Sequence, residues 1–413
     1  MIVSNISRTP AGHYRANWRE PSGRVRAKTF KTKKEAARFL AELDSTLGKG
    51  TYVDPHAGRT PFRVIAQRWL DSRNHEANTK ARDASIMRNH VITKWGDWPL
   101  SKIDHLAVQE WVTALGNRRS PATVAECHRL TSAVLKSAVR NRLIAFNPCE
   151  GVRLPRRRKR DTDEQVISRE DLRTRLLPAV PARYRALVAT AAGTGLRWGE
   201  AAGLCVDALD VDRRELRVIR TVVEVSGQTT FKAYPKSAAG RRTVPLPSWI
   251  MPILQEHRET FPAGEQGILF ANSVGKPLRR TLFRVRVWRP SLVRAGLLGE
   301  YELVDQHTVR AVWADGSGAR HTKEFPTERE AVRHLAREAA GGLVFHGLRH
   351  SYATWLVDDG VPVNMVQRVM GHERSSTTLD LYTRRTEGHD RIRKALGDDD
   401  PDDGPTGVRP PSR

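Results

Sequence analysis

Apolar residues recur at helical spacing through the second quarter of the chain. From residue 61 to residue 147 they fall three and four positions apart, which is the period of one buried face of an α-helix. The positions on these faces are Phe62, Ile65, Ala66, Trp69 and Leu70 near the start, and Leu130, Val134, Leu135 and Ala138 near the end. We therefore expect an all-helical domain of roughly ninety residues, over 60–154.

Shorter alternating runs precede this region. Residues 14–18 and 25–30 have the pattern of strands, and Pro-Ser-Gly at 21–23 separates them as a turn. The stretch that follows, KTKKEAARFLAEL, has the pattern of a helix. Residues 1–57 are therefore expected to form a small module of two or three strands and one helix.

The same module occurs twice. Residues 14–43 align without gaps to residues 309–338, and thirteen of the thirty positions are identical, among them Trp18 with Trp313 and Phe30 with Phe325. Random pairing over such a window would give roughly two or three identities. We expect a second strand and helix module to be inserted at 298–341.

The rest of the chain mixes helices and strands. A basic linker, 155–163, contains PRRRKRD and is followed by a helix that opens at Ser168. Apolar helices interrupted by Gly-Thr-Gly at 193–195 come next, then β-rich runs at 214–225 and 241–247, then helices. The expected fold class is mainly α with small β-sheets (α+β), with a mixed domain at 164–396 and a disordered acidic tail at 397–413.

The net charge of this folded chain limits the kinds of partner that it can bind. The 413 residues carry a formal charge of +24, which favours a nucleic acid or an acidic membrane surface. No apolar run approaches the ~18 residues of a spanning helix, so we expect no membrane span. The positive charge is concentrated in residues 1–297, whereas 298–341 carry −2, 342–396 carry +2 and the tail carries −3. Three separated cysteines and the absence of a signal-like amino terminus favour a reducing, cytoplasmic location.

Four stretches carry the candidate chemistry: AAGTGLRWGEAAGL at 191–204, YPKSAAGRRTVPL at 234–246, FHGLRHSYATWL at 345–356 and VMGHERSSTTLDLYTRR at 369–385. Each alone is weak, since an arginine after a turn, a His-x-x-Arg pair or a single tyrosine is usually structural. Together they supply two guanidiniums for phosphodiester oxygens and a tyrosine that can form a phosphate ester. They also supply a lysine and histidines for proton transfer. No carboxylate cluster for a metal accompanies them, so the combination indicates phosphoryl transfer without metal or cofactor.

Over almost its whole length the sequence resembles the tyrosine recombinases, specifically phage-type integrases. The family's R-K-HxxR-H-Y signature falls on six residues: Arg197, Lys236, His346, Arg349, His372 and Tyr382. Glu200 matches the acidic position that supports the family's active site, and Lys232 is the competing candidate for the lysine. The resemblance implies that the three regions are an arm-type DNA-binding-like module, a core-binding domain and a catalytic domain.

The resemblance also implies a mechanism and partners. Tyr382 would attack a DNA phosphate to give a 3′-phosphotyrosyl link, with Arg197 and Arg349 clamping the phosphate and Lys236 protonating the leaving 5′-oxygen. His346 would assist proton transfer, and His372 would bind a non-bridging oxygen. The partners would be double-stranded DNA at attachment sites, a homotetramer, a directionality factor (excisionase) and a host DNA-bending protein, in a bacterial, nucleoid-associated setting. The DNA-contact candidates are Arg24, Arg26 and Lys28 of the first module and Arg156, Arg157, Arg158 and Lys159 of the linker.

The insertion departs from the family's usual layout, in which the segment like 287–297 runs almost directly into the HxxR helix. We expect it on a surface loop, because the halves of the site must still meet. It could contact DNA, contact a protein, or have no role, and its near-balanced charge disfavours the first. For the whole chain, the alternatives are a type IB topoisomerase-like enzyme and a non-catalytic DNA-binding regulator.

Overall fold

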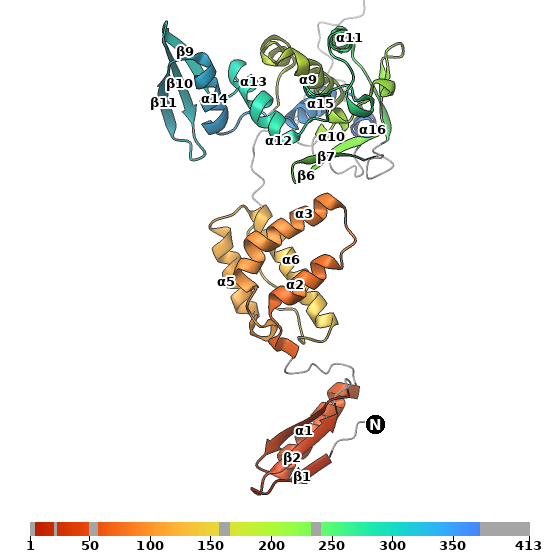
Figure 1. Ribbon diagram of the computed structural model, residues 1–413, viewed down its shortest axis with the longest axis vertical. Coiled ribbons are helices and arrows are strands. Elements are labelled where there is room, and N and C mark those ends of the chain that lie inside the picture. The colour runs from red at the N-terminus through yellow and green to blue at the C-terminus, as the bar shows by residue number, and fades with distance from the viewer. Residues whose placement is uncertain (1–4, 20–22, 49–56, 157–165, 233–240, 372–413) are drawn as a thin grey trace, which may run out of the picture. The chain divides into compact units, whose positions relative to one another are not determined.

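The computed structural model of the chain describes residues 5–19, 23–48, 57–156, 166–232 and 241–371. The chain divides near residue 159 into two compact units (Figure 1). Six of the residues singled out above lie outside the described ranges: Lys236, His372, Tyr382, Arg157, Arg158 and Lys159. The acidic tail lies outside them as well.

The amino-terminal module is a three-stranded antiparallel sheet with one helix. Its elements are β1 (Asn5–Arg8), β2 (Tyr14–Arg19), β3 (Val25–Phe30) and α1 (Lys33–Gly48), in the sheet order β1-β2-β3. Alternation along β2 directs Ala16 and Trp18 into a small core with Ala36 and Leu40 of α1. The opposite face of the sheet carries Arg15 and Arg19 of β2, which are exposed.

The helical domain has its own core. Its helices are α2 (Phe62–Asp71), α3 (Ala77–Ile86), α4 (Ile92–Trp95), α5 (His105–Gly116) and α6 (Pro121–Arg140). Asp104 caps α5 by accepting a hydrogen bond from the Ala107 N–H, and Ser120 caps α6 in the same way through Thr123. Buried Trp95 packs edge-on against Trp98 and Trp111 at the centre.

The second unit is built around a buried helix, α9 (Ala182–Thr194). Every residue from Ala186 to Thr194 is buried, which is the pattern of a helix surrounded by protein. It packs against α11 (Met251–Thr260) and α15 (Gly347–Asp358). The other helices are α7 (Arg169–Asp171), α8 (Leu177–Ala179), α10 (Trp198–Ala202), α12 (Arg280–Phe283), α13 (Arg289–Arg294) and α16 (Val363–Met370). A π-helical turn, η9 (Arg284–Trp288), joins α12 to α13.

Two small antiparallel sheets flank these helices. One has the order β4-β5-β8, and the other is the hairpin β6-β7. Their bounds are β4 (Leu209–Asp210), β5 (Glu215–Val218), β6 (Thr221–Val225), β7 (Gln228–Lys232) and β8 (Arg242–Pro245). Helices with small antiparallel sheets make up the described chain, so the expected α+β fold class is confirmed.

The insertion repeats the fold of the amino-terminal module. Its elements are β9 (Glu300–Asp305), β10 (Thr308–Ala314), β11 (Arg320–Phe325) and α14 (Glu328–Glu338), in the sheet order β11-β10-β9. The register is equivalent as well: Arg15 pairs with Ser7 and Thr29, and the corresponding Arg310 pairs with Glu302 and Glu324. The two copies therefore share one strand alignment as well as sequence.

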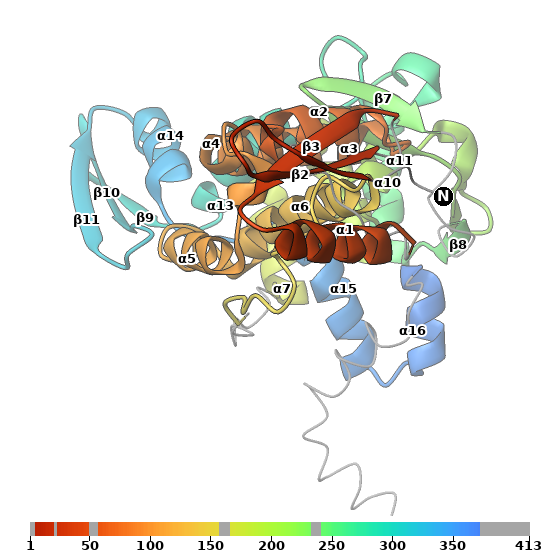
Figure 2. The same ribbon diagram turned by 90° about the horizontal axis from the view of Figure 1, so that it is seen from below.

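The insertion packs closely against the rest of the second unit. Helix α14 lies between its own sheet and α13 (Figures 1 and 2), and Val332 and Leu335 belong to the same hydrophobic core as α9. The Trp288 indole N–H donates to the Leu343 carbonyl at 2.6 Å, where the chain leaves the insertion. Although expected on a surface loop, the insertion is an integral layer whose outer sheet face is exposed, because apolar residues of α14 have a partner in α13.

Asp83 of α3 is a buried carboxylate in the helical domain, and its replacement would show how much its ion pairs contribute to the stability of that domain. Its carboxylate accepts hydrogen bonds from Arg73 and Arg129, both at 3.0 Å, and its side chain is 2% exposed. Asp83→Ala should destabilise α3 and α6 by about 2–3 kcal/mol, because it removes the buried anion between Arg73 and Arg129 and leaves Arg129, within the described ranges, only its pair with Glu126. Hydrogen exchange of peptides from the full chain, resolved by mass spectrometry, would measure the opening free energy.

The matched control for Asp83 is Asp97, whose side chain is 86% exposed while paired to Arg63. Asp97→Ala should change the opening free energy by less than about 1 kcal/mol, because exposed pairs contribute little. Equal effects of the two substitutions would contradict the assignment of Asp83 as the structural anion.

Candidate active site

The first part of the site is the turn between α9 and α10. Helix α9 ends at Gly195, which has φ +62° and accepts no side chain: a Cβ there would come within 2.4 Å of Cδ1 of Tyr352. Arg197 then caps α10, and its backbone N–H donates to Oε2 of Glu200 at 2.9 Å. The Arg197 guanidinium also donates to Oε1 of Glu200 at 2.9 Å, so this turn fixes both residues.

Arg349 comes from the first turn of α15 and is only 3% exposed. Its guanidinium donates to the Gly195 carbonyl at 2.6 Å and to the Met370 carbonyl at 2.5 Å. Desolvation and the neighbouring charge of Arg197 lower the pKa of Arg349 to about 9. The side chain stays charged at neutral pH, and it joins the α9 turn to the end of α16.

Arg242, at the start of β8, completes the arrangement although the sequence reasoning did not single it out. Its side chain is 4% exposed and forms a 2.9 Å ion pair with Glu200. Its Nε also donates to the Val369 carbonyl at 2.6 Å. The adjacent pair Arg241-Arg242 looks like an ordinary surface doublet in the sequence, and only its position beside the expected lysine hairpin could have indicated a role.

These three arginines together cap the carboxyl end of α16. Arg242, Arg349 and Arg197 bind the successive carbonyls of residues 369, 370 and 371, the last at 3.0 Å. The Gly371 N–H bonds the carbonyls of residues 367 and 368, so the end of the helix has no unmatched carbonyl. Cations at a helix carboxyl end also oppose the negative end of its dipole. The chain leaves this cap directly toward residue 372.

The electrostatic balance of the cluster is positive. Burial alone would raise the pKa of Glu200, but the hydrogen bond and charge of Arg242, together with Arg197, lower it below its ordinary value. Glu200 is therefore ionised and offsets one of three guanidiniums. Counted over the described residues alone, the cluster has a surplus of about two positive charges in a largely buried setting, which suits it to hold an anion.

His346 precedes α15 and adds an uncharged imidazole. Desolvation is the main cause that lowers the pKa of His346, to about 4. The nearby positive charges lower it further, and they belong to His350, Arg349, Arg197 and Arg280. The His346 and His350 rings lie perpendicular at 5.0 Å. A neutral imidazole at this place can accept a proton at physiological pH.

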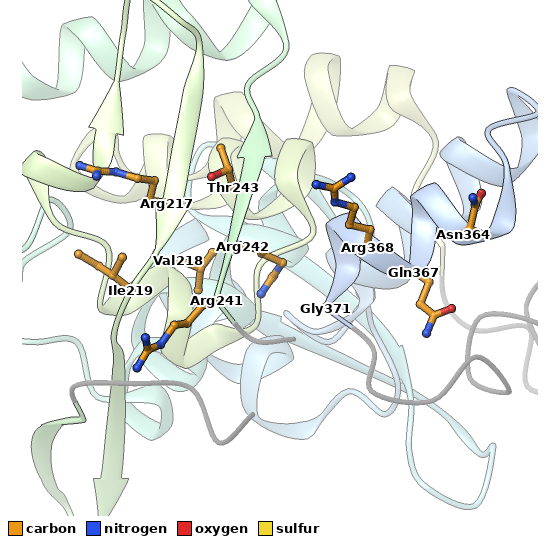
Figure 3. Close-up of a pocket in the computed structure, with 10 residues that line it drawn as sticks. All are labelled: Arg217, Val218, Ile219, Arg241, Arg242, Thr243, Asn364, Gln367, Arg368 and Gly371. Carbon is orange, nitrogen blue, oxygen red and sulfur yellow. The ribbon is translucent and has the colours of Figure 1, made fainter. Parts of the chain in front are cut away.

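An open groove of about 680 Å³ adjoins the cluster (Figure 3). Strands β5 and β8 form one side and α16 forms the other, and Figure 3 shows the Arg242 side chain between β8 and Gly371. Arg217, Arg241 and Arg368 add further cations along it, with Asn364 as a neutral donor. The groove leads from the surface to the arginine cluster.

The structure brings together four of the expected residues, Arg197, Glu200, His346 and Arg349. Lys232, the competing lysine, ends β7 and pairs with Thr221 of β6. Lys236, His372 and Tyr382 lie outside the described residues, in the segments that follow β7 and α16.

The DNA-contact candidates are dispersed. Arg24 and Arg156 are exposed. Lys28 lies over the rings of Phe30 and Phe39, on the helix-covered side of the sheet, and Arg26 occupies the same side of β3. Arg157, Arg158 and Lys159 lie beyond the described part of the linker. On the face of the sheet opposite α1, Arg15 and Arg19 are exposed cations that the alternation of β2 could have identified.

Two further findings bear on the chemistry. In the described ranges, no three His, Cys, Asp or Glu side chains gather as a metal site. None of the helices in those ranges is both long and apolar enough to cross a membrane.

Family models match two parts of the chain: the phage integrase central domain at residues 62–154 and the phage integrase family at residues 320–389. The chain belongs to the phage integrase family of tyrosine recombinases. The putative prophage phiRv2 integrase of Mycobacterium tuberculosis (strain ATCC 25618 / H37Rv) is 27% identical over 94% of this chain and 92% of its own length. A tyrosine recombinase XerC-like protein of Caldanaerobacter subterraneus subsp. tengcongensis is 26% identical over 88% and 90%.

Solved structures share the fold at low sequence identity. The Tn1549 transposon integrase in complex with transposon right end DNA superposes with a TM-score of 0.61 at 18% identity, covering 82% of this chain and all of that one. A lambda integrase dimer bound to a COC′ core site has a TM-score of 0.53 at 14% identity, over 93% and 95%.

Glu200 should set the pH dependence of stability in this unit. Glu200→Gln keeps the size but removes the anion between Arg197 and Arg242, and should cost roughly 2–4 kcal/mol of unfolding free energy at pH 7. Because the folded-state pKa is lowered, the wild-type advantage is present above the unfolded value near 4.5 and is lost as the pH falls further. Urea unfolding between pH 7 and pH 3.5 would measure it.

Glu256, exposed on α11, provides the control. Glu256→Gln should give a curve parallel to the wild type at every pH. A pH-independent difference between wild type and Glu200→Gln would contradict a charge-based role for Glu200.

His346 should be neutral well below the ordinary pKa of a histidine. In the DNA-free protein its titration should centre near pH 4, and His350→Ala should move it upward by removing a neighbouring cation. Isotope-labelled histidine and NMR, with His346→Gln to assign the signal, would follow the titration. An unshifted midpoint near 6.5 would show that the surrounding cations do not act on this ring.

Proposed function

We propose that this recombinase cuts and rejoins DNA at a specific site through Tyr382, with Arg197, Arg242, Arg349, Glu200 and His346 forming the described part of its catalytic centre. The observation that carries the proposal is the cap of three arginines on α16. It holds Gly371, the residue that immediately precedes His372 in the sequence, against the cations that the reaction requires.

The proposed reaction exchanges one phosphodiester for another. Tyr382 Oη bonds to phosphorus, and the bond from phosphorus to the 5′-oxygen breaks. Lys236 supplies the proton that makes the leaving group a 5′-hydroxyl, while the tyrosine proton passes toward neutral His346. The 5′-hydroxyl of a partner strand then attacks the 3′-phosphotyrosyl bond and releases Tyr382. Bond energy is conserved, so no nucleotide cofactor is consumed.

The charge of the cluster fits this reaction. A phosphodiester carries one negative charge, and its five-coordinate transition state carries two. The described cluster offers a surplus of about two positive charges, held by ion pairs and backbone carbonyls before substrate arrives. Arg197, whose side chain is 42% exposed, is the guanidinium open to the phosphate, whereas buried Arg349 and Arg242 act from behind it.

The proposed assembly is a homotetramer that pairs two attachment sites on double-stranded DNA. The related Tn1549 integrase is seen with transposon DNA and the lambda integrase dimer with a core site, which supports DNA as the partner. In this proposal, the reaction integrates and excises a phage or other mobile element on the bacterial nucleoid. An excisionase and a host DNA-bending protein would set its direction.

Covalent trapping tests the proposal. DNA from both flanks of the gene encoding this chain, carrying a nick that lets the 5′-hydroxyl fragment diffuse away, should yield a protein–DNA adduct resistant to detergent. Mass spectrometry should place the link at Tyr382, and Tyr382→Phe should lower adduct formation at least about a thousandfold, because phenylalanine has no nucleophilic oxygen. Tyr184→Phe removes a hydroxyl elsewhere in the same unit and should react like the wild type.

Two outcomes would overturn the proposal. A wild type that never forms an adduct would be a DNA-binding regulator. Relaxation of any supercoiled plasmid, without a need for a particular sequence, would make the enzyme topoisomerase-like.

A further inference from the structure

The insertion forms a second concentration of arginines, away from the catalytic cluster. A cavity of about 830 Å³ lies between α14 and the segment of η9 and α13. Arg284, Arg286, Arg289 and Arg294 line it from one side, and Arg329, Arg333 and Arg337 of α14 line it from the other. Among the described residues, no carboxylate lines this cavity, which we call the arginine groove.

The net charge of the insertion does not reveal this groove, because the acidic residues of its sheet and the arginines of its helix lie on different faces of the module. The outer sheet face carries Glu300, Glu302 and Glu324, and Arg310 between the strands is paired to the last two. The three arginines of α14 are four residues apart and therefore share the face toward α13. A charge of −2 over 298–341 thus combines an acidic sheet face with a basic helix face.

Comparison with the amino-terminal copy shows where the second copy has changed. The positions equivalent to Arg329, Arg333 and Arg337 are Lys34, Arg38 and Glu42. The helix face has therefore kept two cations and gained a third. On the sheet face the change is opposite, since Ser7 and Thr29 correspond to Glu302 and Glu324.

Within the described ranges, most of the groove's positive charge is not balanced by carboxylates. Arg289 donates to the backbone carbonyls of Ala339 at 2.5 Å and Gly341 at 3.2 Å and to that of Ala336, and so holds the end of α14 in place. Arg337 pairs with Glu338 at 2.6 Å. In the part of the chain that the structure describes, the remaining five form no ion pair with a carboxylate: Arg284, Arg286, Arg294, Arg329 and Arg333.

Helix α12 links the catalytic centre to the arginine groove along the chain. Arg280, which opens α12, lies close enough to His346 to contribute to lowering its pKa. Arg284 follows one helical turn later, about 6 Å along the axis, and lines the groove. A cationic path thus runs from His346 along α12 and η9 to α14.

We propose that the arginine groove binds the phosphate backbone of duplex DNA beyond the catalytic centre, so that the insertion is a second DNA contact of this enzyme. Guanidiniums match phosphate oxygens in geometry. The row on α14 spans about 12 Å, a length over which one DNA strand presents three or four phosphates at about 3.4 Å each. The lining offers no aromatic anchor of the kind a protein partner requires. The proposal rests on the proposed recombinase function.

Salt-dependent binding tests the groove. The full-length protein and the variant Arg329→Ala/Arg333→Ala would be titrated against a fluorescein-labelled 40-base-pair duplex of arbitrary sequence at several salt concentrations. Loss of two phosphate contacts should weaken binding about tenfold near 0.15 M salt and reduce the slope of log K against log salt by roughly 1.8. Thermal unfolding would verify that the variant folds.

The matched control removes two cations from the same module outside the groove, Arg320→Ala/Lys323→Ala on β11. It should keep the wild-type slope. An unchanged slope in the groove variant would overturn the proposal, as would equal losses in both double variants. If the groove variant binds one duplex normally but no longer holds two duplexes together, the groove takes a protein and the proposal is wrong. A wild type that forms no covalent adduct with nicked DNA would instead refute the proposed function and leave the slope comparison standing.

Discussion

Three arginine side chains bound to the three carbonyls at the end of one short helix hold the catalytic unit in its working arrangement. Arg197, Arg242 and Arg349 come from a turn, a strand and a helix that are far apart in the sequence, and all converge on residues 369–371. A helix end needs partners for its last carbonyls, and a phosphate site needs guanidiniums. The structure meets both needs with the same groups, so folding of α16 and assembly of the site are one event.

Glu200 reduces the electrostatic repulsion among these three arginines. Three guanidiniums this close repel one another, and burial of a charge without a partner is costly. One carboxylate, bonded to both Arg197 and Arg242, lowers the repulsion without cancelling it. Backbone carbonyls, which carry only partial charge and cannot be protonated, balance part of the remainder. The free enzyme therefore retains a positive field that a phosphate can complete.

The sequence predicted the elements whose signal is local. The helices over 62–140 follow from apolar spacing, the strands of the first module from alternation, and those of the insertion from its repeat of that module. Arg197 and Glu200 followed from the resemblance to the recombinase family. Arg242 was missed because its role depends on burial and on carbonyls more than a hundred residues away, which no local pattern encodes. The arginine groove was hidden for a related reason, since a net charge does not tell which face of a module carries it.

The paired copies of the small module also differ in what surrounds them. In the insertion the apolar side chains of α14 pack into the core and must fit their neighbours, whereas the arginines of the same helix line an open cavity and the outer face of the sheet is exposed. Packing therefore does not require a cation at Arg329 or Arg333, although both copies of the helix carry one at these two positions. The charge itself, and not the fit of the side chain, is the property that the two copies share there.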